Sequence, residues 1–93
     1  MPVRFDWDPH KARTNLQKHG VSFDEACSVF DDAMFITVLD EEHSVHEERY
    51  ITIGISARNR LLLIAHADVD ETTRIISARK AKTYERRFYE EGL

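Results

Sequence analysis

The sequence lacks the features that would place it in several protein classes. A single cysteine, Cys27, excludes an internal disulfide, and three glycines and two prolines in 93 residues are too few for a low-complexity chain. The longest apolar run covers five residues (61–65), whereas a membrane-spanning helix needs about 20. Residues 1–9 contain no signal-peptide core, so we expect one cytoplasmic domain spanning residues 1–93. Cys27 lies among apolar positions, and we interpret it as a packing residue.

Negative charge is in excess, but it is unevenly distributed. The formal net charge is -4, which argues weakly against broad electrostatic binding of nucleic acid. Residues 74–93 carry six Lys and Arg against three Asp and Glu, whereas residues 1–73 carry seven against fourteen. An anion-binding site is therefore expected near the C-terminal end of the chain.

The first third of the chain predicts one strand and two helices. VRFDWD (3–8) alternates apolar and polar residues, which is typical of a short half-buried strand. Asp8 can cap a helix over 9–19 that begins with a proline and ends at a glycine. Ser22 begins a capping box for a second helix over 23–31.

The remainder predicts an antiparallel sheet followed by a helix. Strand patterns separated by short loops occur at 34–39, 49–56, 61–67 and 73–79. From about Ala78 or Lys80 the apolar period becomes helical and continues to Gly92. The predicted class is α+β, with an N-terminal strand and two helices, three or four antiparallel strands, and a C-terminal helix.

A polar cluster is predicted at one end of the sheet. If the hairpins are centred near residues 58–59 and 70, His66 lies opposite Arg74 and close to Arg49. A histidine beside fixed cations could transfer a proton at a phosphate ester. The alternative is that His66 is a hydrogen-bonded residue at the rim of the core.

A second basic group lies where the last strand gives way to the helix. Arg74 and Arg79 are five residues apart, so they should face opposite sides unless the strand ends before Arg79. Arg79, Lys80 and Lys82 at a helix N-terminus would strengthen a phosphate site. The alternative is a solvated basic surface.

Other polar and aromatic residues have two interpretations each. Lys18 and His19 end the first helix, where they could serve the helix dipole or a site. The HSVH segment (43–46) has no further ligand in view, so no metal site is predicted. Tyr84 and Phe88 could stack on RNA bases, but their helical spacing is more typical of a core.

Five segments together resemble the BrnT family of bacterial type II toxins. They are FDWDPHKARTNLQKHGVSFDEACSVFDD, HEERYITIGIS, IAHA, TRIISARKA and ERRFYEEG. The resemblance implies a RelE-like fold, ribonuclease activity that slows translation, and a BrnA-type antitoxin whose DNA-binding part represses their shared operon. The polar residues that recur in the family fall on Lys18, His19, Glu48, Arg49, His66, Arg74, Ser77, Arg79, Lys80 and Glu85. Two positions depart from the family pattern: Val69 replaces an arginine, and Lys82 replaces a threonine.

The leading hypothesis is an endoribonuclease that acts on mRNA without metal or cofactor, through attack of the 2′-hydroxyl on the adjacent phosphate. His66 is predicted to transfer a proton, with Lys18 or His19 as the second proton carrier. Arg49, Arg74 and Arg79 would stabilise the phosphorane. RNA contacts are predicted for Ser77, Lys80, Lys82 and Glu85.

The expected complex is a hetero-oligomer with the antitoxin, which alone would contact operator DNA, and no membrane contact is predicted. The alternative function is a binding module with little or no catalysis, acting through the antitoxin complex and control of the operon.

Overall fold

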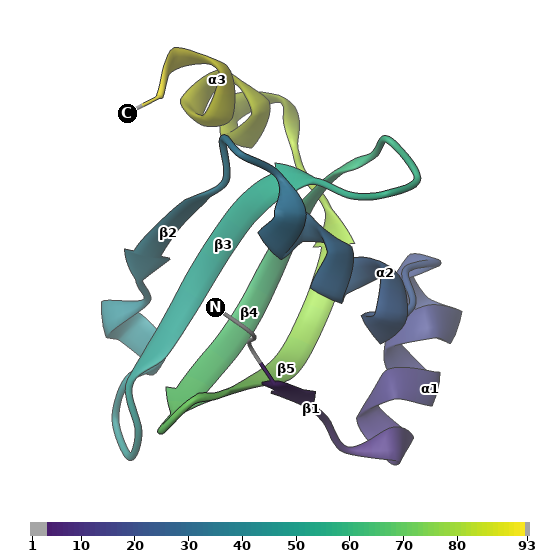
Figure 1. Ribbon diagram of the computed structural model, residues 1–93, viewed down its shortest axis with the longest axis vertical. Helices are drawn as coiled ribbons and strands as arrows, with labels where there is room; N and C mark the ends of the chain where they lie inside the picture. The colour runs from purple at the N-terminus through teal and green to yellow at the C-terminus, as the bar shows by residue number, and fades with distance from the viewer. Residues whose placement is uncertain (1–3, 93) are drawn as a thin grey trace.

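The alternating segments form one five-stranded sheet in a computed structural model that describes residues 4–92 (Figure 1). The strand order is β1-β5-β4-β3-β2. The strands are β1 (Arg4–Asp6), β2 (Ile36–Leu39), β3 (Arg49–Ile55), β4 (Leu61–Val69) and β5 (Thr72–Lys80). The α-helices are α1 (Pro9–His19), α2 (Phe23–Ser28) and α3 (Thr83–Glu91), and single 3-10 turns cover Val29–Asp31 and Glu41–His43.

The sheet is mixed, which corrects the expectation of a purely antiparallel one. Strands β2 to β5 pair antiparallel, as predicted, but β1 pairs with β5 in parallel, with Phe5 opposite Thr73. The predicted N-terminal strand is confirmed at residues 4–6, whereas Val3 lies outside the described residues.

Local capping explains where the first two helices begin and end. The Asp8 carboxylate accepts the His10 N–H at 3.0 Å, and Gly20 ends α1 with a φ of 70°, a conformation that favours glycine. The Ser22 hydroxyl accepts the Glu25 N–H at 3.0 Å, as the capping-box pattern predicts. The predicted second helix tightens into a 3-10 turn after Ser28.

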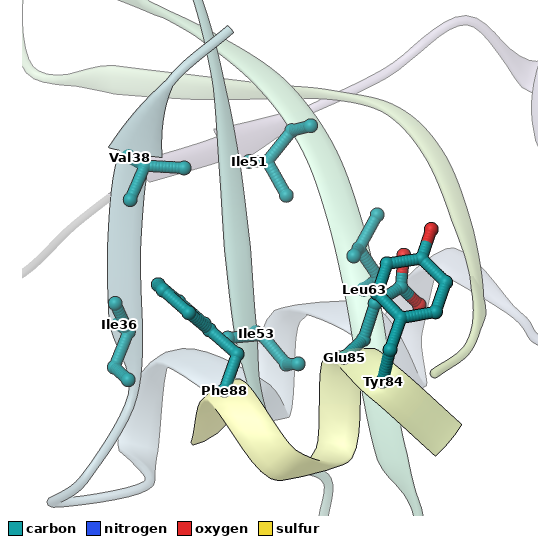
Figure 2. A pocket seen from close by; sticks show the side chains of 8 residues that line it. All are labelled: Ile36, Val38, Ile51, Ile53, Leu63, Tyr84, Glu85 and Phe88. Carbon is teal, nitrogen blue, oxygen red and sulfur yellow. The ribbon is translucent and has the colours of Figure 1, made fainter. Parts of the chain in front are cut away.

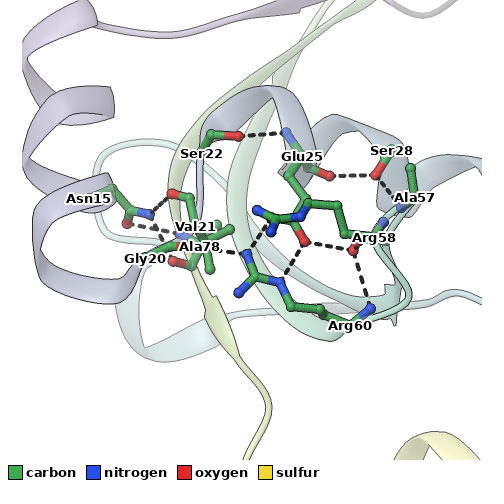
Figure 3. Close-up of polar contacts among 11 residues, drawn as sticks. Asn15, Gly20, Val21, Ser22, Glu25, Ser28, Ala57, Arg58, Arg60 and Ala78 are labelled. Carbon is green, nitrogen blue, oxygen red and sulfur yellow. Dashed lines mark hydrogen bonds and ion pairs between the residues drawn. The ribbon is translucent and has the colours of Figure 1, made fainter.

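Helices α1 and α2 cover one face of the sheet, which we call the helix face. Val21, Phe23, Ala26 and Val29 pack against four residues of the sheet, Leu62, Ile64, Ile75 and Ala78. The buried Glu25 ties α2 to the turn between β3 and β4, because it accepts hydrogen bonds from Ser56 and Arg60 (Figure 3). The hydrogen bond from Arg60 lowers the pKa of Glu25, so this buried carboxylate stays charged.

Helix α3 packs on the opposite face, which we call the outer face. Side chains alternate along a strand, so Ile53 and Leu63 point away from α1 and α2. They line a hollow with Phe88 and Tyr84 of α3 (Figure 2). The helix begins at Thr83 rather than at the predicted residue 78 or 80, because β5 continues to Lys80. Among residues 4–92, no helix is long and apolar enough to cross a membrane.

Candidate functional site on the outer face of the sheet

The strand registers separate His66 from the two arginines predicted to join it. His66 pairs with Tyr50 and Ile75, whereas Ala67 pairs with both Arg49 and Arg74. Each hairpin is thus shifted by one residue from the predicted register, and a shift of one residue moves a side chain to the other face. His66 lies on the helix face, and Arg49 and Arg74 lie together on the outer face.

A bulge in β5 also changes the predicted placement of Arg79. Ala65 pairs with Ser77 and His66 pairs with Ile75, so Ile76 is an extra residue in β5. Because of this extra residue, the side chains of Ser77 and Arg79 point to the same face as that of Arg74. Arg74 and Arg79 therefore share the outer face, although five residues separate them, and the prediction of opposite faces is wrong.

Arg49 and Arg74 hold the carboxylate of Glu47 between them. Arg74 Nη2 donates to both Glu47 oxygens, at 3.0 and 3.1 Å, and Arg49 Nε lies 3.7 Å from Glu47 Oε1. Among the buried side-chain nitrogen and oxygen atoms of residues 4–92, only Arg49 Nε has no hydrogen-bond partner. Guanidinium groups bind carboxylates and phosphates with similar geometry. The pair is therefore arranged to bind an anion, and Glu47 occupies that position here.

Arg79 is paired with Glu85 across the junction of β5 and α3. Two hydrogen bonds, at 2.9 and 2.8 Å, join the guanidinium to the carboxylate. The bonds from Arg79 lower the pKa of Glu85 and raise that of Arg79, and Glu85 also accepts the Lys82 N–H at 2.8 Å. Arg79 thus fixes the start of α3, while Lys80 and Lys82 are exposed beside it.

A hollow of about 280 Å³ between α1 and β5 brings Lys18, His19 and Ser77 together. The full lining is His10, Lys11, Thr14, Asn15, Lys18, His19, Ile76 and Ser77, with no acidic side chain among them. Sequence reasoning missed His10 and Lys11. The signal was available, because residues 11, 14, 15 and 18 form one stripe of a helix.

Asn15 positions this hollow by tying α1 to the free edge of β5. Its Nδ2 donates to the carbonyls of Ala78, at 2.8 Å, and Val21, at 2.9 Å, and its Oδ1 accepts the Ala78 N–H at 3.1 Å (Figure 3). Strand β1 pairs with β5 only as far as Arg74, so it does not reach the backbone of Ala78. The side-chain amide of Asn15 forms hydrogen bonds with Ala78 in its place. Asn15 is a further residue that the sequence patterns did not reveal.

Both ring nitrogens of His66 form hydrogen bonds. Nδ1 lies 2.8 Å from Asp68 Oδ1, and Nε2 lies 2.8 Å from Thr52 Oγ1, which in turn bonds Thr37 Oγ1 at 2.7 Å. Because the carboxylate only accepts, the neutral ring carries its proton on Nδ1, and Nε2 accepts from Thr52. Burial lowers the pKa of His66, although Asp68 opposes this shift.

The burial of His66 does not fit the predicted contact with a phosphodiester. The residue is 2% exposed, and Tyr50 stacks on its ring with centroids 5.8 Å apart. The alternative interpretation, a hydrogen-bonded residue at the rim of the core, fits the hydrogen bonds of His66, although the residue lies deeper in the core than a rim position. Glu48, from the same predicted set, is exposed and accepts a long hydrogen bond of 3.4 Å from Tyr50 Oη.

The remaining candidates lie in three other parts of the fold. His43 Nδ1 lies 2.9 Å from Asp40, and no group of three or more His, Cys, Asp or Glu in residues 4–92 could hold a metal ion. Phe88 is half-buried and lines an apolar hollow beneath α3, whereas Tyr84 at the rim of this hollow is 66% exposed, so the prediction of a core position is wrong for Tyr84 (Figure 2). Burial raises the pKa of the Cys27 thiol to about 11, so it stays protonated at neutral pH.

The fold is that of a bacterial ribonuclease toxin. The crystal structure of the Brucella abortus ribonuclease toxin BrnT aligns with a TM-score of 0.67 at 20% sequence identity, covering 88% of this chain and 100% of that one. The family model "Ribonuclease toxin, BrnT, of type II toxin-antitoxin system" matches residues 7–85, so the chain belongs to the BrnT family. No curated protein shows significant sequence similarity to it.

Proposed function

We propose that this protein is a RelE-like, metal-independent endoribonuclease that cleaves mRNA in the bacterial cytoplasm and thereby inhibits translation. A BrnA-type antitoxin would neutralise it in a hetero-oligomer and would alone contact operator DNA. The observation that carries the catalytic part is the Glu47 carboxylate held between Arg49 and Arg74, because a substrate phosphate can replace it. Membership of a ribonuclease toxin family supports the same reaction class.

The reaction needs cations at the phosphate and two proton carriers. Attack by the 2′-hydroxyl makes a phosphorane with extra negative charge, which Arg49 and Arg74 would stabilise. Lys18 and His19 lie beside Ser77 in the hollow next to α1, where one of them would take the 2′ proton and the other would protonate the leaving 5′ oxygen. Ser77 lies three residues from Arg74, roughly 10 Å along the strand, so one RNA segment could reach both places.

The other predicted residues receive supporting roles. Lys80 and Lys82 are exposed and would contact the RNA backbone, while Arg79 and Glu85 hold the β5–α3 junction unless RNA separates them. His66 is assigned a positioning role: its hydrogen bond to Thr52 holds β4 against β3, the strand that carries Arg49.

The reaction class is tested with a short RNA and the same RNA carrying single 2′-deoxy substitutions. The protein, in buffer with excess EDTA, should cut the RNA and leave a 2′,3′-cyclic phosphate. A 2′-deoxy group on the 5′ side of a cleaved bond should protect that bond alone. Cleavage that ignores the deoxy substitution, or that needs an added divalent ion, would contradict 2′-hydroxyl attack.

A binding module with weak or absent catalysis is the second candidate function. The burial of His66 favours it, because the predicted proton carrier is withdrawn from the outer face. Val69 is exposed, and the resemblance to the BrnT family implies an arginine at this position, so the surface would carry one cation fewer. Bacterial growth after expression of the protein without its antitoxin distinguishes the ribonuclease toxin from the binding module, because only the toxin should arrest growth.

A further inference from the structure

Strand β2 forms an edge of the sheet, and its short length of four residues is its one protection against pairing with another strand. Natural edge strands are commonly shielded by lysine, proline or a bulge. The segment MFITVL (34–39) contains no charged residue and no proline, and β2 pairs with β3 in unbroken register. Its side chains are also exposed, Val38 and Leu39 by 43% each and Met34 by 68%. An unshielded apolar edge of this kind marks a place where another strand docks.

The backbone groups available for pairing can be assigned. The Asp40 N–H donates to the Arg49 carbonyl at 2.7 Å, so it points toward β3. Successive N–H groups of a strand alternate in direction, so those of Thr37 and Leu39 point away from β3, to the free edge. An added strand would therefore bond to Thr37 and Leu39.

One face of the edge continues into an apolar hollow. Ile36 and Val38 line a hollow of about 200 Å³ that Phe88 of α3 closes on the other side (Figure 2). Every second side chain of an added strand would lie beside Val38 on this face. Apolar residues at alternate positions of the partner would then extend the packing beneath α3.

The negative charges near the ends of β2 indicate which kind of strand can pair with its free edge. Asp31 precedes the strand, and Glu41 and Glu42 follow it, all three exposed. Two copies of this chain related by a two-fold axis would pair β2 antiparallel, which brings together two copies of segment 31–42, a segment with five Asp and Glu and no Lys or Arg. Repulsion disfavours that dimer, whereas a strand with basic residues at both ends is complementary.

We propose that the free edge of β2 binds an extended segment of the antitoxin, with alternating apolar residues and Lys or Arg at both ends. The inference rests on the antitoxin part of the proposed function and not on RNA cleavage. It assigns the docking of the partner to the edge of the sheet opposite β1.

The probe is a synthetic peptide, Lys-Lys-Thr-Val-Thr-Val-Thr-Val-Lys-Lys, with a control peptide in which glutamates replace the four lysines. Binding of the lysine peptide should slow hydrogen exchange of the Thr37 and Leu39 amides. The glutamate peptide should bind at least roughly tenfold more weakly, since several exposed charge pairs are reversed. Equal binding of the two peptides, or unchanged exchange at both amides, would overturn the proposal.

Two sets of variants locate the contact. Leu39→Pro removes an outward N–H but keeps the bonds to β3, so it should abolish binding, whereas Leu39→Ala should bind within about threefold of the natural chain. The double variant Glu41→Lys, Glu42→Lys tests the charge without touching the backbone, and it should bind the glutamate peptide better than the natural chain does. If Leu39→Ala lost as much binding as Leu39→Pro, the result would contradict pairing through the backbone. If the double variant did not bind the glutamate peptide better than the natural chain does, the result would contradict selection by charge.

Two further measurements separate this proposal from its alternatives. A dimer of the isolated chain in sedimentation, lost in Leu39→Pro, would show that a second copy occupies the edge and would overturn the proposal. RNA cleavage by Leu39→Pro should match the natural chain. If the natural chain cleaves no RNA yet binds the peptide as described, the ribonuclease proposal fails and the docking site stands.

Discussion

Glu47 is the residue whose side chain competes most directly with a substrate. Its carboxylate lies between Arg49 and Arg74, where the proposed phosphate binds. Sequence patterns selected both arginines but not Glu47, because it lies in an irregular loop where no periodicity assigns a direction to a side chain. The neighbouring Glu48 contacts Tyr50 on the helix face instead.

Replacing Glu47 by glutamine should therefore strengthen RNA binding. The change removes a negative charge facing two arginines, and we expect the affinity for a 2′-O-methyl RNA, which cannot be cleaved, to rise roughly threefold, as for partly exposed ion pairs. Fluorescence anisotropy measures the affinity. Glu48→Gln changes the net charge equally and is the control. The same gain in both variants would mean that net charge, rather than the anion position, governs binding.

His66 should make the stability of the fold depend on pH. Burial holds its folded-state pKa below that of the unfolded chain, about 6.5. The unfolded state therefore binds a proton first, so the free energy of unfolding is highest above about pH 6.5 and falls as the pH decreases below it.

Urea unfolding of the natural chain and of His66→Gln at a series of pH values isolates this contribution. The variant should be less stable near pH 7.5, because the hydrogen bonds to Thr52 and Asp68 are disturbed, by roughly 1–3 kcal/mol. The difference between the two proteins should shrink as the pH falls from about 7 to 5. A difference that does not vary with pH would show that His66 does not titrate as described.

At the scale of elements, the contact between α1 and β5 depends on Asn15. Its amide satisfies the N–H and carbonyl of Ala78 and the carbonyl of Val21 in a buried position. Asn15→Leu keeps the side-chain size but leaves these backbone groups unpaired, so we expect a loss of roughly 2–4 kcal/mol in the free energy of unfolding. Leu16→Ala, at the next and exposed position, is the control and should change stability by less than about 1 kcal/mol. Equal losses of unfolding free energy in the two variants would show that Asn15 does not hold α1 to β5.

The elements themselves were largely predictable, because their signals are local. The caps at Asp8 and Ser22 and the alternation in residues 49–67 depend on neighbours in sequence, and the helices and strands follow them. The registers were not predictable, since Ile75 and Ile76 both fit a buried strand and nothing in the sequence marks one as the extra residue. For the same reason, the shared face of Arg74 and Arg79 appears only in the structure.

For the whole molecule, the sheet divides buried polar groups from accessible ones. Helices α1 and α2 cover the face that holds His66, while α3 covers only part of the other face, beside Ile53 and Leu63 (Figure 1). A chain with a net charge of -4 thus places Arg49, Arg74 and Arg79 on one surface. Bulk charge could not predict this, because it averages over both faces.

The central claim is that RNA binds the outer face, and methyl signals on neighbouring residues of β4 and β5 test it most directly. A 2′-O-methyl RNA is titrated into protein labelled at its alanine and isoleucine methyl groups, and the spectra are compared. The methyl signals of Ala65 and Ala67, which lie beside Ser77, Arg49 and Arg74, should shift. Those of Ile64 and Ile75, on the helix face, should stay in place. Shifts confined to Ile64 and Ile75 would contradict the account, because they would place the RNA on the side of His66.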